Sequence, residues 1–258
     1  MQIRTTLLAL SLALPIGATN HATSSAASSW DALAASIESA ARAGRSDELR
    51  GLRASCLKLL TTAPADREPL LRYAAAYVGW RLAVLPDVPK HEVPGLLDDA
   101  VEHLRVALKK NDRFAEAHAL LGGVYGLQIG ASPWKGITLG PRASSAIGRA
   151  AELEPDNPRV LLQQGISAFH SPAMFGGGPA KAEAHLRRSL ERFEQEPAGR
   201  AWPNWGRVDA HAWLGQVLQK RGDLAGARRH FDAALALAPE NGWVRYVLLP
   251  RLDKAQKR

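Results

Sequence analysis

The chain has 258 residues, of which 46% are hydrophobic and 22% are charged, a balance that excludes an intrinsically disordered protein. Its length allows one large domain or a short array of repeats. The formal net charge of +8 is typical of a solvated basic face with a charged tail, Lys254 to Arg258, and the alternative is attraction to acidic partners or anionic lipid. Because no nucleic-acid-binding motif accompanies this charge, nucleic acid is not an expected partner.

Residues 1–27 have the pattern of a secretory signal peptide. A basic start, Met1 to Arg4, precedes an apolar run from Thr5 to Ala18, and small residues follow, so cleavage is expected between residues 18 and 27. No run in the chain approaches the roughly 20 apolar residues that a membrane helix needs. We therefore expect a periplasmic or secreted protein with no integral membrane span. The single cysteine, Cys56, lies too far along the chain to carry the lipid of a lipoprotein.

Residues 28–95 show helical spacing of apolar positions without a clear repeat motif. Ser28 and Ser29 can cap a helix that begins at Trp30, and a turn at residues 44–47 leads into a second helix of about 47–62. A third helix spans about 67–85, and three prolines then enforce a connection. We interpret this region as degenerate helical repeats.

A regular register begins at residue 96. Helices are predicted at 96–109 and 115–125, and the pattern of a second helix returns at Ala143 about nine residues late. The extra segment, Gln128 to Pro141, is rich in glycine and proline, so we expect a loop there. Pro158 begins another helix, to Phe169, and its partner starts near Pro179 after a glycine-rich loop.

The stretch 208–241 carries the clearest motif, and an insertion containing Trp202 and Trp205 precedes it. Small Gly215 and Ala227 suit a close approach of two helices, and Asp223 can cap the second helix. The motif is a pattern roughly 34 residues long. Its positions are occupied by Leu214, Gly215, Leu218, Gly222, Asp223, Ala227, Phe231, Ala234 and Pro239. These residues resemble a tetratricopeptide repeat (TPR). Gly122 and Gly165 hold the position of Gly215 in two earlier helices.

The resemblance implies an all-α fold, a right-handed TPR-like superhelix of about four to five helix pairs with inserted loops. The array would cover residues 96–241, and residues 242–258 would form a capping helix and a basic tail, since the ends of such arrays need a cap. In this family the first helices line a concave groove that commonly holds a peptide. By repeat register the groove-facing candidates are Arg159, Leu162, Ile166, Phe169, Asp209, Gln216, Gln219 and Lys220, preceded by Glu116, Ala119 and Gly123.

Four aromatic residues fall in the inserted segments: Trp134, Phe175, Trp202 and Trp205. Aromatic side chains on loops can act as binding anchors. The alternative is that their rings fold back and fill gaps between unevenly spaced repeats. The sequence leaves both interpretations open.

No catalytic or metal site is predicted. The chain has no nucleophile elbow, P-loop, dinucleotide fingerprint or His-Glu-x-x-His motif, and its eight histidines lack close metal-ligand spacing. We therefore expect no cofactor and no enzymatic activity.

The favoured function is a protein- or peptide-binding scaffold of the bacterial cell envelope, with an acidic partner suited to the positive charge. The alternative is a small-ligand carrier resembling the TPR proteins associated with some transporters. A closed apolar cavity beneath the Phe175 and Trp205 loops would favour the carrier, and an open groove would favour the scaffold.

Overall fold

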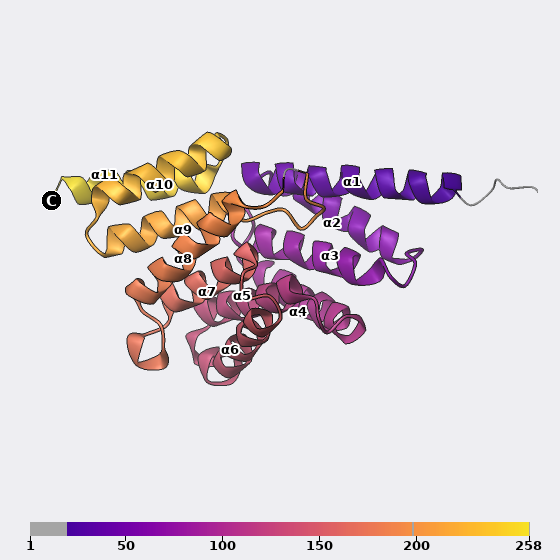
Figure 1. Ribbon diagram of the computed structural model, residues 1–258, viewed down its shortest axis with the longest axis horizontal. Coiled ribbons are helices and arrows are strands. Elements are labelled where there is room, and N and C mark those ends of the chain that lie inside the picture. The colour runs from indigo at the N-terminus through magenta and orange to yellow at the C-terminus, as the bar shows by residue number, and fades with distance from the viewer. Residues whose placement is uncertain (1–19, 198, 258) are drawn as a thin grey trace, which may run out of the picture.

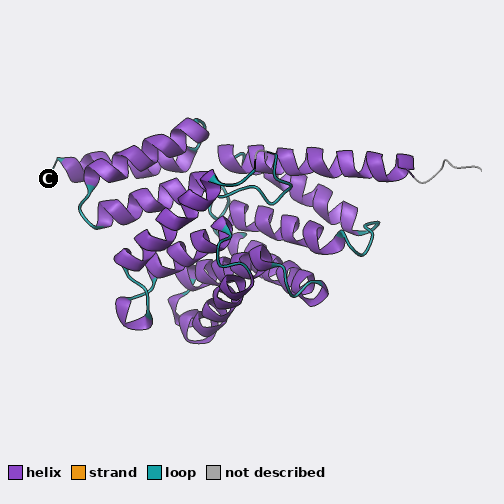
Figure 2. Cartoon of the chain, viewed as in Figure 1, coloured by secondary structure: helices purple, strands orange, loops and turns teal. Residues whose placement is uncertain are grey.

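The computed structural model describes residues 20–197 and 199–257. This part of the chain is helical throughout apart from its connections, and no strand occurs in it (Figure 2). Its α-helices are α1 (Asn20–Ala43), α2 (Ser46–Leu60), α3 (Glu68–Ala83), α4 (Val93–Lys110), α5 (Ala115–Ala131), α6 (Gly136–Leu153), α7 (Pro158–His170), α8 (Pro179–Glu194), α9 (Arg207–Lys220), α10 (Leu224–Leu237) and α11 (Leu249–Gln256). Short turns η1 (Pro133–Lys135), η2 (Ala173–Phe175) and η3 (Val244–Leu248) complete the set. The prediction of an all-α fold is confirmed.

The helices pack as successive pairs, α1 with α2 through α9 with α10, and each pair also contacts the next (Figure 1). The array curves so far that its two ends meet. The carboxyl end of α1 touches the segment after α10, where the Asn241 amide donates to the carbonyl oxygen of Arg42 at 3.2 Å and Arg45 pairs with Glu240 at 3.2 Å. The contacts between the two ends of the array therefore close part of its concave side.

The glycines of the repeat register stand where two helices touch. A Cβ atom added to Gly215 would lie 2.3 Å from the Phe231 ring of α10, and one added to Gly165 would lie 2.6 Å from Cγ of Leu186 in α8. Any larger side chain would push the paired helices apart, because both neighbours are fully buried. The close approach predicted at these positions is confirmed.

The predicted loop from Gln128 to Pro141 is wrong. Helix α5 continues to Ala131, and α6 begins at Gly136 with Pro141 inside it. Leu139, Ala143 and Ala146 pack on the core at helical spacing, so their burial outweighs the poor helix propensity of the glycines and the proline. The insertion thus lengthens two helices.

Beyond α10 the chain forms η3, a short π-helical turn, which runs into α11. Both lie in residues 242–258, for which a capping helix and a basic tail are predicted. Val244, Leu248 and Leu252 are buried and cover α10.

Most of the predicted signal peptide, residues 1–19, lies outside the described residues. Helix α1 begins at Asn20, inside the interval predicted for cleavage. Among the described helices, none combines the length and the apolar character needed to cross a bilayer.

Candidate functional site

The concave face is divided into a covered part and an open part. Residues 195–206, which we call the inner segment, leave the end of α8 and run across the face before α9 begins. Trp202 is 7% exposed and Trp205 is 1% exposed. The inner segment and the surface under it, on α3, α5 and α7, form the closed half of the concave face.

An aromatic cluster holds the inner segment against α3. Trp205 stacks on Tyr77 with 4.9 Å between ring centroids, and its indole nitrogen donates to the hydroxyl of Tyr73 at 3.0 Å. Trp202 meets Tyr73 edge to face at 5.1 Å and also contacts Trp30 of α1. Fully buried aromatic side chains at these separations contribute strongly to stability.

A charged network fixes the other end of the inner segment. Arg159 of α7, whose side chain is 0% exposed, pairs with both carboxylate oxygens of Glu196 at 2.6 and 3.0 Å. Arg200 also pairs with Glu196, and it contacts Glu116 of α5 at 2.8 Å. Burial alone would raise the pKa of Glu196, but the hydrogen bonds and charges of the two arginines outweigh burial and lower it. Glu196 is therefore ionised at neutral pH.

A second buried pair joins the two ends of the array. Arg81 of α3 donates to Asp209 of α9 at 2.8 Å and to the carbonyl oxygen of Ala41 in α1 at 3.0 Å. Burial lowers the pKa of Arg81, but the charge and the hydrogen bond of Asp209, together with Tyr77 and Glu38, outweigh burial and raise it. One guanidinium group thus ties three helices together.

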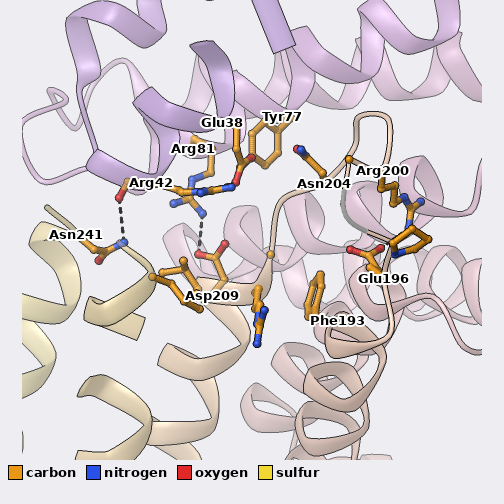
Figure 3. A pocket seen from close by; sticks show the side chains of 16 residues that line it. Glu38, Arg42, Tyr77, Arg81, Phe193, Glu196, Arg200, Asn204, Asp209 and Asn241 are labelled. Carbon is orange, nitrogen blue, oxygen red and sulfur yellow. Dashed lines mark hydrogen bonds and ion pairs between the residues drawn. The ribbon is translucent and has the colours of Figure 1, made fainter. Parts of the chain in front are cut away.

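A cavity of about 280 Å³ remains beside this pair (Figure 3). It lies between α1, α3, the inner segment and the start of α9. Charged groups dominate its wall, from Glu38, Arg42, Arg81, Glu196, Arg200, Arg207 and Asp209. Its chemistry differs from the closed apolar cavity expected of the carrier.

The open half of the concave face carries a strip of half-buried aromatic side chains. Trp213 of α9 lies between Phe169 of α7, at 5.6 Å, and Trp243, at 5.5 Å between centroids. We call these three residues the aromatic strip. Lys220 sits 4.8 Å above the Phe169 ring and is exposed. The strip combines apolar surface with one positive charge, which suits an extended chain that carries apolar and acidic side chains.

His170 borders the strip and packs against Trp213 at 5.4 Å. Burial, followed by the charge of Lys220, lowers the pKa of His170. This side chain is therefore neutral at pH 7, and Lys220 is the charged group beside the strip.

Some of the groove-facing candidates lie in the closed half of the concave face, and the others lie in the open half. Arg159 and Leu162 are 0% exposed under the inner segment, so these two lie in buried packing. Asp209 is half-buried, pairs with Arg81 and lines the cavity. Ile166, Phe169, Gln216 and Gln219 are half-buried and Lys220 is exposed. Trp213 and Trp243, which were not among the groove-facing candidates, complete the open surface.

Of the four aromatic residues in the insertions, two are buried and two are exposed. Trp202 and Trp205 point inward and fill the closed half, as the packing interpretation requires. Trp134 is 73% exposed and Phe175 is 75% exposed, so only these two stand on the surface. Their predicted role in binding stays a prediction.

Comparisons with known proteins agree with this architecture. Residues 208–241 match the model of the tetratricopeptide repeat family. The fold is similar to that of TTC0263, a thermophilic TPR protein of Thermus thermophilus, with a TM-score of 0.58 and 20% identity over 83% of this chain and 92% of that one. It is also similar to the HusA haemophore from Porphyromonas gingivalis, with a TM-score of 0.63 and 22% identity over 75% of this chain and 93% of that one. No curated protein matches the sequence.

The glycine contacts, the stacked helix pairs and the matched repeat lead to the same assignment. Residues 208–241 are a tetratricopeptide repeat, and the chain is a helical repeat protein with a TPR-like fold.

Proposed function

We propose that the protein is a non-enzymatic scaffold of the bacterial cell envelope, which binds an extended segment of a partner protein along the aromatic strip. The single observation that carries the proposal is the half-buried line of Phe169, Trp213 and Trp243 on the concave side. Tryptophan and other large aromatic residues supply much of the free energy of binding at protein interfaces. Lys220 adds a preference for an acidic residue in the partner.

The closed half supports this proposal by example. There the concave side already holds an extended segment, with Trp205 inserted among aromatic rings and Glu196 paired with Arg159. A partner segment on the aromatic strip would use the same two kinds of contact, an apolar anchor and a charge pair. It would lie beside the inner segment, because removing Trp205 from its buried site would cost several kcal/mol.

Site-specific photo-crosslinking tests the proposal. A photoreactive residue at Gln219, next to the strip, should crosslink to a partner in cells of the source organism, whereas one at Arg229, exposed on α10, should not. Trp213→Ala and Phe169→Ala should each reduce the crosslinked product about tenfold or more, as hot-spot truncations do. Equal products from both positions, or products unchanged in both variants, would contradict the proposal.

The envelope location is part of the proposal and rests on the signal-peptide pattern of residues 1–27. Fractionation of cells that express the full chain should recover it from the periplasm or the medium, shortened at its amino end. A chain that lacks residues 2–18 should remain in the cytoplasm. Recovery of both forms from the same compartment would rule out this location.

A small-ligand carrier is the second candidate, favoured by the cavity of about 280 Å³ and by the likeness of the fold to a haemophore. The charged wall of this cavity suits a small polar ligand better than an apolar one. Native mass spectrometry of the purified protein should then reveal a bound small molecule that Arg42→Ala releases. A mass equal to that of the bare chain, in repeated preparations, would count against the carrier.

A further inference from the structure

Two turns of the array carry large apolar side chains that point into solvent. The first includes η1 and the start of α6, where Trp134 is 73% exposed and Ile137 is 85% exposed. The second includes η2, where Met174 is 83% exposed and Phe175 is 75% exposed. Exposed apolar groups scattered singly are common on proteins, but clusters of large ones on consecutive turns mark interaction surfaces.

Both turns lie at the same edge of the array. Each joins the first helix of a pair to the second, and the first helices α5 and α7 pack against each other (Figure 1). Successive pairs of a helical array repeat the same orientation, so equivalent turns face the same side.

The second turn is a fixed structure. Backbone hydrogen bonds from Gly176 to Ala173, from Gly177 to Pro172 and from Gly178 to Ala168 close it. A Cβ atom on Gly177 would lie 2.2 Å from the carbonyl oxygen of Ser171, so this residue must be glycine. Because the backbone is held in this way, the exposure of the two apolar side chains is built into the fold.

The charged residues in and next to both turns are basic. Residues 125–151 contain no Asp or Glu and include Lys135 and Arg142, while Arg149, farther along α6, pairs with Glu152 at 3.1 Å. Residues 166–182 contain no Asp or Glu and include Lys181. An edge that combines exposed apolar groups with positive charge complements an anionic surface.

We propose that this edge docks on an anionic lipid bilayer, with Trp134, Ile137, Met174 and Phe175 in the headgroup region and the flanking basic residues against lipid phosphates. Tryptophan is enriched at the membrane–water interface, and basic residues near the surface are attracted to anionic lipids. None of these four residues belongs to the aromatic strip.

Vesicle sedimentation tests the proposal with the purified protein. It should sediment with vesicles of phosphatidylglycerol and phosphatidylethanolamine, and about tenfold or more weaker with phosphatidylcholine alone, because each basic side chain near an anionic surface strengthens attachment. Raising the salt concentration should weaken the first interaction. Equal sedimentation with both vesicles, or with neither, would overturn the proposal.

Three variants locate the contact. Trp134→Ser combined with Phe175→Ser should weaken sedimentation with anionic vesicles about tenfold or more, because two apolar anchors are lost. Lys135→Glu combined with Lys181→Glu should do the same through charge. Tyr246→Ser is the matched control, since Tyr246 is 74% exposed but lies in η3, outside both turns, and it should bind as the unchanged protein does.

A spectroscopic readout separates this edge from other surfaces. Lipids with brominated chains should quench part of the tryptophan emission, and Trp134→Phe should abolish that part while keeping sedimentation. Because these side chains are exposed, apart from the half-buried Lys135, circular dichroism should be unchanged in every variant. If the two double variants bind vesicles as well as the control does, or if the edge crosslinks only to protein, the proposal is wrong.

Discussion

In the closed half of the concave face, aromatic side chains of α3 are covered by Trp202 and Trp205, whereas Phe169, Trp213 and Trp243 in the open half remain partly accessible. Both surfaces are rich in aromatic rings, and both include a basic residue from a first helix, Arg159 or Lys220. They differ in what covers them. The inner segment covers the first surface, whereas no segment within residues 20–197 and 199–257 covers the second.

Aromatic content therefore does not by itself identify a binding surface. The same ring chemistry serves stability where the chain supplies the cover, and it is available for a partner where the chain does not. The two halves should therefore respond differently to substitution, in stability for the closed half and in partner binding for the open half.

The largest expected effect is that of Trp205→Ala. Removing a 1% exposed indole that stacks on Tyr77 and donates to Tyr73 should lower the free energy of unfolding by about 3–5 kcal/mol. Denaturation in urea measures this change. Trp134→Ala is the control at a 73% exposed site and should change stability by less than about 0.5 kcal/mol. Similar losses in the two variants would remove the distinction between a covering segment and a surface loop.

Glu196→Ala tests whether charge also holds the inner segment. The substitution leaves the Arg159 guanidinium buried without its carboxylate partner, and an uncompensated buried charge should cost about 3 kcal/mol. Glu194→Ala removes a carboxylate that is exposed two residues earlier in α8 and should be nearly neutral. If Glu196→Ala leaves the free energy of unfolding unchanged, the aromatic cluster alone holds the inner segment in place.

The register of the repeats was predictable because it is local. Gly122, Gly165 and Gly215 recur in phase with apolar positions, and each sits where a helix pair touches. Such spacing depends only on the 3.6-residue period of a helix and on the contact with its partner. The helix pairs, their order and the capping segment follow from it.

The path of the inner segment was not predictable in this way. Trp205 contacts Tyr73 across 132 positions of the chain, and that meeting depends on curvature accumulated over several repeats. A weak signal did exist, since Tyr73, Tyr77 and Trp80 form an aromatic stripe at helical spacing and the insertion supplies two tryptophans. The extension of α5 and α6 was not predicted because their glycine and proline content is typical of loops, while the apolar period that holds them helical is weaker.

The open half also depends on the contact between α9 and α10, and acid should weaken this contact. Nδ1 of His211 lies 3.0 Å from Nδ1 of His230. Burial, followed by the charge of His230, lowers the pKa of His211 to about 4. An unfolded chain binds a proton near the ordinary histidine pKa of about 6.5, so stability is fully present above that pH and is lost as the pH falls towards 4.

Between pH 7 and pH 5 this histidine should reduce the free energy of unfolding by about 1–2 kcal/mol, the lower figure allowing for solvent screening of a partly exposed ring. Urea denaturation at the two pH values measures the loss, and His211→Leu should make it smaller. Hydrogen exchange should show α9 and α10 opening more readily at pH 5 while α3 changes little. An unchanged pH dependence in His211→Leu would mean that the other buried histidines cause the loss.

A small effect on stability is expected for Trp213→Ala in the open half. Trp213 touches Phe169 and Trp243 but is only half-buried, so its truncation should cost about 1 kcal/mol, less than half the loss in Trp205→Ala. Both substitutions replace a tryptophan with alanine, so a difference between their urea midpoints reports how deeply each indole ring is buried. If the two losses were equal, Trp213 would be a core residue and the strip would offer a partner little surface. A smaller loss of stability, together with reduced crosslinking at Gln219, would show that Trp213 contributes more to partner binding than to folding.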